Sequence, residues 1–266
     1  MPKKLSAAVL LLVIVMAASA YAQDASPPFP NRAEAGSAAD HSVAAPAKIV
    51  KAILVKSWGD NPVWANLNTN WSTYGKTPVS IDHTTLISSD FTYQDLVNSK
   101  ANVIILSNPA GGTHQYSPAE FAAIAKYAKK GHAILGTYLT FKNGSIDNRR
   151  LAPVFGLRPK IDYSYTGISN AFKKDAPHAC LLKKISGSSW QSNGFSYSQV
   201  PLSGSWRKNL GKAKAVADSD TFVGMISLYT TKAYTGIYVS NMPEYKNVGG
   251  DDEQLLYNAL TCYVKK

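Results

Sequence analysis

The residues of this 266-residue chain that could do chemistry gather in two short loops of the stretch Ala101–Phe141. The first loop holds Asn108 and the pair Gly111-Gly112, whose backbone N–H groups could be presented to an anion or a carbonyl oxygen. His114 follows in the same loop and could transfer a proton. The second loop holds Tyr138, whose phenol could donate a hydrogen bond or a proton to a ligand. The same residues also fit an ordinary turn, a solvated imidazole and a packed aromatic ring, so both interpretations stay open.

The elements around the two loops predict where these residues lie. An apolar strand at Val103–Ser107 precedes the first loop, and a strand from Ala133 runs into the turn at 136–140. Between them, Ser117-Pro118-Ala119-Glu120 is a capping box with proline at the first helical position, and Gly131 is suited to end the helix. This rhythm predicts parallel strands, with both loops at the carboxyl edge where ligands of open α/β sheets bind.

The rest of the chain extends this pattern and then changes it. Hydrophobic periodicity predicts strands at 48–57 and 77–84 and helices at 62–74 and 90–99, the latter with Leu96 and Val97 turned inward. Residues 158–209, rich in Gly, Ser, Tyr and Lys, read as an insertion of short strands and loops. Strands at 213–218, 221–230 and 233–240 and a helix at 251–262 follow. We therefore predict an α/β fold, with a flavodoxin-like, mostly parallel sheet flanked by helices and a β/loop-rich insertion.

The N-terminal segment has the layout of an export signal. Lys3 and Lys4 precede an apolar run at 7–18 and a small-x-small site at 20–22, which predicts a signal peptide over residues 1–22. Residues 23–47, rich in Ala, Pro and Ser, are expected to be a flexible linker, and residues 48–266 a single domain. The expected location is secreted or periplasmic, with no membrane span after signal cleavage.

Charge and cysteine content narrow the partners. The formal net charge is +11, and about +9 once Lys3 and Lys4 are removed, which suits an anionic surface, although scattered lysines also simply keep a protein in solution. The sequence has no dense basic run with interleaved aromatic residues, so nucleic acid is not expected as a partner.

Cys180 and Cys262 are the only cysteines, and we expect them to form a disulfide in an exported chain. The histidines show no zinc-type spacing, and no cofactor is expected.

The core stretch also resembles a known superfamily. VIILSNPAGG, followed by a helix and AILGTYLTF, resembles the class I glutamine amidotransferase-like superfamily, and the chain looks closest to its ThuA-like, trehalose-utilisation-type branch. Two further segments, APHACLLKKISGSSW and YTGIYVSNMPEY with DDEQLLYNALTCYV, look like parts of the same branch. The resemblance covers most of residues 48–264 and implies the fold predicted above.

The departures from the family pattern concern its catalytic positions. The cysteine of the nucleophile elbow falls on Tyr138, the last elbow glycine on Thr140, and the catalytic histidine near Met242, whereas Glu244 matches the acidic residue. A phenol with a pKa of about 10 cannot readily replace a thiolate, and acyl transfer needs a nucleophile beside a base. The resemblance therefore implies catalytically degenerate positions and no glutaminase activity.

Two functions follow as hypotheses. The first is an exported, non-catalytic protein that binds a small polar or carbohydrate ligand through Asn108, Gly111, Gly112, Tyr138 and Glu244. The alternative is a sugar-modifying enzyme of the ThuA-like type that uses Glu244 with Tyr138 or His114. Aromatic residues could line a sugar-binding cleft or be ordinary core residues; they are Trp58, Trp64, Trp190, Phe195, Tyr197 and Trp206.

Overall fold

The computed structural model describes residues 48–59, 62–165, 170–174, 180–185, 187, 189–192, 197–201, 210–219, 224–245 and 250–264, with backbone only for 162–165, 170–174, 189–192 and 197–201. The predicted signal peptide and linker lie outside these residues. Those two predictions and the domain boundaries therefore stay predictions.

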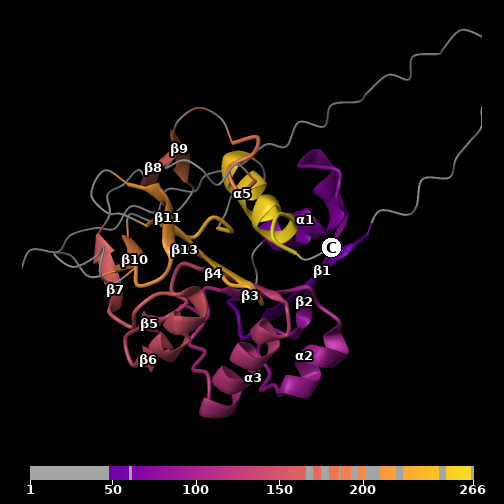
Figure 1. The fold of residues 1–266 in the computed structure, drawn as a ribbon, viewed down its shortest axis with the longest axis vertical. Coiled ribbons are helices and arrows are strands. Elements are labelled where there is room, and N and C mark those ends of the chain that lie inside the picture. Colours follow the sequence, from indigo (N-terminus) through magenta and orange to yellow (C-terminus); the bar gives the residue numbers. More distant parts are fainter. Residues whose placement is uncertain are drawn as a thin grey trace, which may run out of the picture. The chain divides into compact units, whose positions relative to one another are not determined.

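The centre of the fold is a five-stranded parallel sheet. Its order is β2-β1-β3-β4-β13, which is the flavodoxin-like arrangement (Figure 1). The central strands are apolar on both faces, as expected for parallel strands covered by helices on each side. The bounds are β1 Val50–Val55, β2 Val79–Leu86, β3 Val103–Ser107, β4 Ala133–Thr137 and β13 Thr235–Val239. The predicted α/β class and flavodoxin-like sheet are confirmed.

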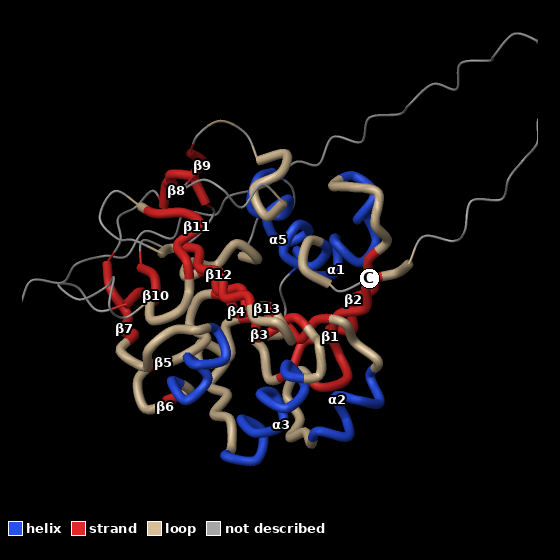
Figure 2. The backbone as a smooth tube through the Cα atoms, viewed as in Figure 1, coloured by secondary structure: helices blue, strands red, loops and turns tan. Residues whose placement is uncertain are grey.

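Helices cover both faces of this sheet, as Figure 2 shows. The residues of α1 (Pro62–Asn70) and α5 (Gly250–Thr261) pack into one apolar core, and those of α2 (Tyr93–Ser99) and α3 (Pro118–Lys129) into the other. A 3-10 segment, η1 Trp71–Thr73, follows α1. After β4 come a small hairpin, β5 Lys142–Asn143 with β6 Ile146–Asp147, and a second 3-10 segment, η2 Arg149–Phe155. Within α2, Leu96 is buried as predicted, but the inward placement of Val97 is wrong, since its side chain is exposed.

An antiparallel extension continues the sheet beyond β13 in the order β12-β11-β8-β9. The predicted insertion is present as β7 to β10, but β8 and β9 join the main sheet instead of forming a separate unit. β7 and β10 pair with each other. The bounds are β7 Ile161–Tyr165, β8 Asn170–Lys174, β9 Ser189–Ser192, β10 Tyr197–Pro201, β11 Lys214–Asp218 and β12 Ile226–Thr230.

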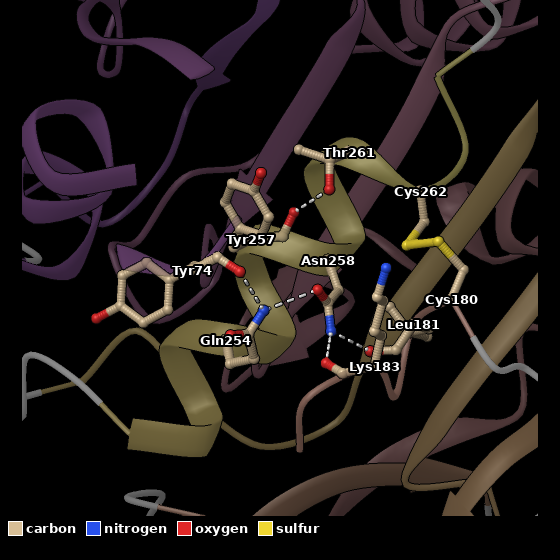
Figure 3. Close-up of a disulfide and its surroundings, with 9 residues drawn as sticks. All are labelled: Tyr74, Cys180, Leu181, Lys183, Gln254, Tyr257, Asn258, Thr261 and Cys262. Atoms are coloured by element: carbon tan, nitrogen blue, oxygen red, sulfur yellow. Dashed lines mark hydrogen bonds between the residues drawn. A yellow bond between two sulfur atoms is a disulfide. The ribbon is translucent and has the colours of Figure 1, made fainter. Parts of the chain in front are cut away.

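The predicted disulfide links the start of the loop 180–185 to the end of α5 (Figure 3). The Cα atoms of Cys180 and Cys262 are 5.7 Å apart, within the range that a disulfide spans. Asn258 of α5 donates to the carbonyls of Leu181 and Lys183 at 2.8 and 2.7 Å, so hydrogen bonds hold the same loop. The longest described helices, α3 and α5, have 12 residues, short of the about 20 apolar residues that a bilayer span needs.

Candidate functional site

The loops that follow β1, β3, β4 and β13 come together at the carboxyl edge of the parallel strands. The N–H of Trp58, after β1, donates to the carbonyl of Ser107 at the end of β3 at 2.9 Å. The N–H of Asn108 donates to Thr137 at 3.3 Å, and the N–H of Tyr138 donates to Asn241 at 3.0 Å. Neighbouring loops are thus joined by backbone hydrogen bonds. The strand order reverses between β1 and β3, which is where ligands bind in such sheets.

Glu244 lies beneath these loops with no exposed surface. The hydroxyl of Ser107 donates to its Oε1 at 2.7 Å, and the hydroxyl of Thr137 donates to the same atom. The indole N–H of Trp64 donates to Ser107 Oγ at 3.0 Å, which fixes that hydroxyl from the α1 side. The other carboxyl oxygen, Oε2, has no hydrogen-bond partner among the described residues.

Burial raises the pKa of Glu244 to about 7, because water is absent to stabilise the carboxylate, and the bonds from Thr137 and Ser107 offset only part of that effect. A carboxyl group with this pKa exchanges its proton near neutral pH.

Tyr138 occupies the sharp turn after β4 with a φ of 45°. This left-handed conformation is uncommon for a residue with a side chain and is found at functional turns. Its carbonyl accepts a 2.8 Å hydrogen bond from the hydroxyl of Tyr238. Its side chain is buried in a small cluster with Ala110, Leu139 and Met242.

The Asn108 loop is built by close packing. Asn108 also has a left-handed φ, 48°, and its amide donates to the sulfur of Met242 at 3.8 Å, while its buried Oδ1 has no partner within the described part of the chain. A Cβ on Gly111 would lie 2.2 Å from that Oδ1, so only glycine fits there. The N–H of Gly112 donates to the Asn108 carbonyl at 3.2 Å. The structure therefore uses the Gly112 donor within the loop itself.

His114 lies on the β1 side of the loop. Burial lowers the pKa of His114, and the positive charge of Lys56 lowers it further. A hydrogen bond with the Ser57 backbone raises the pKa and offsets part of this effect. The amide of Asn148 donates to the His114 carbonyl at 2.9 Å. The described contacts thus associate His114 with Lys56 and Ser57, and Glu244 with Ser107 and Thr137.

Three residues of this edge, Ser107, Thr137 and Tyr245, were not anticipated from the sequence, whereas Trp58 was among the aromatic candidates. Ser107 and Thr137 are the last residues of buried apolar strands. A hydroxyl side chain at the end of such a strand is the sequence signal that could have identified them. Trp58 and Tyr245 stack with ring centroids 6.1 Å apart and an interplanar angle of 19°. Trp58 is 39% exposed and Tyr245 is half-buried, so Trp58, backed by Tyr245, presents an aromatic surface at the strand edge.

Of the other aromatic candidates, only Trp64 has a described side chain. Trp64 is buried in the core, and the side chains of Trp190, Phe195, Tyr197 and Trp206 lie outside the described part. Within the described side chains, no three His, Cys, Asp or Glu residues gather as a metal site would require.

Comparisons with known proteins identify the fold. No family model matches the sequence, and no curated protein matches it. A ThuA-like protein from Bacteroides uniformis is similar over 83% of this chain and 94% of its own, with a TM-score of 0.50 and 16% identity. Two cytoplasmic proteins of Salmonella typhimurium, STM1381 and STM3548, are similar over 82% of this chain and 100% of theirs, with TM-scores of 0.54 and 0.50 and identities of 12% and 13%. The chain therefore has a ThuA-like fold, as the sequence resemblance predicted.

Proposed function

We propose that this chain is an exported, non-catalytic binding protein that holds a small polar or carbohydrate ligand at the carboxyl edge of its parallel strands. The observation that carries the proposal is the exposed Trp58, stacked on the half-buried Tyr245, at the point where the strand order reverses. Aromatic faces pack against the C–H faces of sugar rings while neighbouring polar groups bind the hydroxyls. Asn108, with its unpartnered oxygen, follows Ser107 in the adjoining loop.

The arrangement around Tyr138 supports binding rather than acyl transfer. Its side chain is buried beside Met242, a residue that cannot act as a base. In this proposal the elbow has kept its strained backbone and lost its nucleophile. Export is supported by the predicted signal peptide and is compatible with the disulfide, since disulfides persist in oxidising compartments.

A second candidate, the sugar-modifying enzyme, is favoured by one observation. The pKa of Glu244 is raised to about 7 by burial, which suits general acid–base work at neutral pH. In this alternative Glu244 would exchange a proton with substrate through Tyr138 or His114 after the loops move, because the carboxyl group has no exposed surface. Turnover of a sugar, followed by NMR and lost in Glu244→Gln, would favour this candidate over the first.

Trp58→Ala tests the binding proposal. Titration of the mature protein with neutral sugars such as glucose, galactose and cellobiose, followed by tryptophan fluorescence and calorimetry, should detect saturable binding without turnover. We expect Trp58→Ala to weaken this binding about fivefold and Trp58→Phe to keep most of it, because a good aromatic contact is worth about 1 kcal/mol.

Val97→Ala is the matched control, since Val97 is as exposed as Trp58 and lies on α2. Equal loss in both variants, or no saturable binding to the wild type, would overturn the proposal. Ammonia release from glutamine by the wild type would overturn its non-catalytic part.

A further inference from the structure

Two adjoining hollows on the surface around η2 are lined by cationic side chains. One, of about 540 Å³, is lined by Asp147, Arg149, Arg150, Pro153 and Pro159. The other, of about 350 Å³, shares Pro153 and is also lined by Arg158, Lys212 and Tyr229. Among the described residues that line them, Asp147 is the only acid, and none belongs to the candidate site at the strand edge.

Among the described residues, an acid pairs with Arg149, and none forms an ion pair with Arg150 or Arg158. Arg149 forms a fork with Asp147, with Nη2 to Oδ2 at 2.5 Å, and this pair lowers the pKa of Asp147. Arg150 is exposed and its guanidinium lies 5.6 Å from the centre of the Phe121 ring, a contact that positions the group without neutralising it. Arg158 is exposed, and its Cγ would lie 3.5 Å from a Cβ on Gly211.

The floor of the second hollow is rigid. The N–H groups of Lys212 and Ala213 donate to the carbonyl of Gly156 at 2.8 and 3.3 Å. Gly156 has a φ of 70°, and a Cβ there would lie 2.4 Å from the ring of Tyr229. The two loops that carry Arg158 and Lys212 are thus held side by side, which places these two cationic residues next to one another in the sequence-distant loops.

We propose that these hollows bind an acidic polysaccharide, whose carboxylates recur along the chain and meet the guanidinium groups in turn. Guanidinium binds carboxylate through two parallel hydrogen bonds, which favours arginine over lysine at such sites. Two hollows in succession suit an extended polymer rather than a single small anion.

Two other polyanions fit this surface less well. Single-stranded nucleic acid would need an aromatic platform for its bases, yet the Tyr229 ring is covered by Gly156 and lies edge-on to Tyr234. A lipid surface would need exposed apolar side chains nearby. The large exposed ones of the described residues are Ile49, Trp58 and Val97, and none of them lines either hollow.

The test is binding of the mature protein to polygalacturonate at low ionic strength, with dextran as the neutral comparison. We expect the wild type to bind polygalacturonate and not dextran. Arg150→Gln with Arg158→Gln should weaken binding at least about tenfold and lower the dependence of log K on log salt by roughly two. Arg150→Lys with Arg158→Lys should lose part of the affinity, because the charge stays and the fork is lost.

The matched control also removes two positive charges, but from another hollow. Lys76 and Lys183 line a hollow of about 520 Å³ beside the disulfide, and Lys76→Gln with Lys183→Gln should change binding less than about threefold. Equal weakening by both pairs would show that net charge alone acts and would overturn the site. Absence of wild-type binding, or tighter binding to double-stranded DNA or phosphatidylglycerol vesicles, would overturn the polysaccharide assignment. Circular dichroism confirms that each variant is folded.

Discussion

At the scale of single residues, the carboxyl group of Glu244 links the core of the fold to its candidate site. Ser107 ends β3 and Thr137 ends β4, and both donate to the same carboxyl oxygen. This places one carboxyl group between two neighbouring strands. The second oxygen remains buried without a partner, which costs free energy in the ionised form.

Glu244→Gln should remove a pH dependence of stability. The folded-state pKa is about 7 against an ordinary value of 4.5, so the unfolded chain releases this proton at lower pH than the folded one. The free energy of unfolding should therefore fall by on the order of 3 kcal/mol as pH rises from about 4.5 through 7. Urea unfolding at pH 5 and pH 8 should show a clearly smaller difference in Glu244→Gln than in the wild type.

Asp82→Asn is the control for that measurement. Although burial raises the pKa of Asp82, bonds from Thr85 and Thr84 outweigh it and the pKa is lowered, so this group titrates below the measured range. An unchanged pH difference in Glu244→Gln would show that the carboxyl group is not the source.

At the scale of elements, the first turn of α3 carries more than a helix cap. Ser117 and Glu120 form the predicted capping box, with Ser117 Oγ accepting from the Glu120 N–H at 3.2 Å. The buried Glu120 carboxylate also lies 2.8 Å from the ammonium of Lys56, at the end of β1. Burial lowers the pKa of Lys56, but Asp90 and Glu120 outweigh burial and raise it. One glutamate thus ties α3 to the loop that follows β1.

Separate substitutions should divide these two roles. Ser117→Ala should cost about 1 kcal/mol of unfolding free energy, the usual value for an N-cap. Glu120→Ala should cost about 3–5 kcal/mol, because it removes the buried carboxylate and leaves the Lys56 ammonium with the exposed Asp90 and a long hydrogen bond to the Gln115 carbonyl. The measurement is urea unfolding at pH 7. Equal losses would mean that the ion pair adds nothing to the cap.

At the scale of the whole molecule, the disulfide joins two segments separated by 82 residues. The loop 180–185 buries Leu181 and Ile185 in the same core as α5, so the bridge and the core act on the same contact. In the chain-entropy model, a loop of this length stabilises the folded state by about 4–5 kcal/mol.

Replacement of both cysteines should reveal this contribution. Cys180→Ser with Cys262→Ser should lower the unfolding free energy by up to about 4 kcal/mol. A reductant should destabilise the wild type by a similar amount and leave the variant unchanged. A wild type whose stability is unaffected by complete reduction, verified by thiol titration, would contradict the prediction.

The sequence by itself determined the parallel part of the fold. β1, β3 and β4 are apolar runs separated by segments with helix signals, and the cap at Ser117 and the stop at Gly131 are local devices. Local patterns specify local structure, so these elements and their order could be read directly. The disulfide followed because the chain has only Cys180 and Cys262 to pair.

Only the tertiary structure decided which side chains meet. The addition of β8 and β9 to the sheet depends on pairing between segments far apart in sequence, and hydrophobic periodicity does not predict such pairing. The burial of Glu244 depends on β3, β4 and the turn after β13 closing over it, so its raised pKa has no local signal. Likewise Trp58 and Tyr245 lie near opposite ends of the chain, and it is the strand order that stacks their rings.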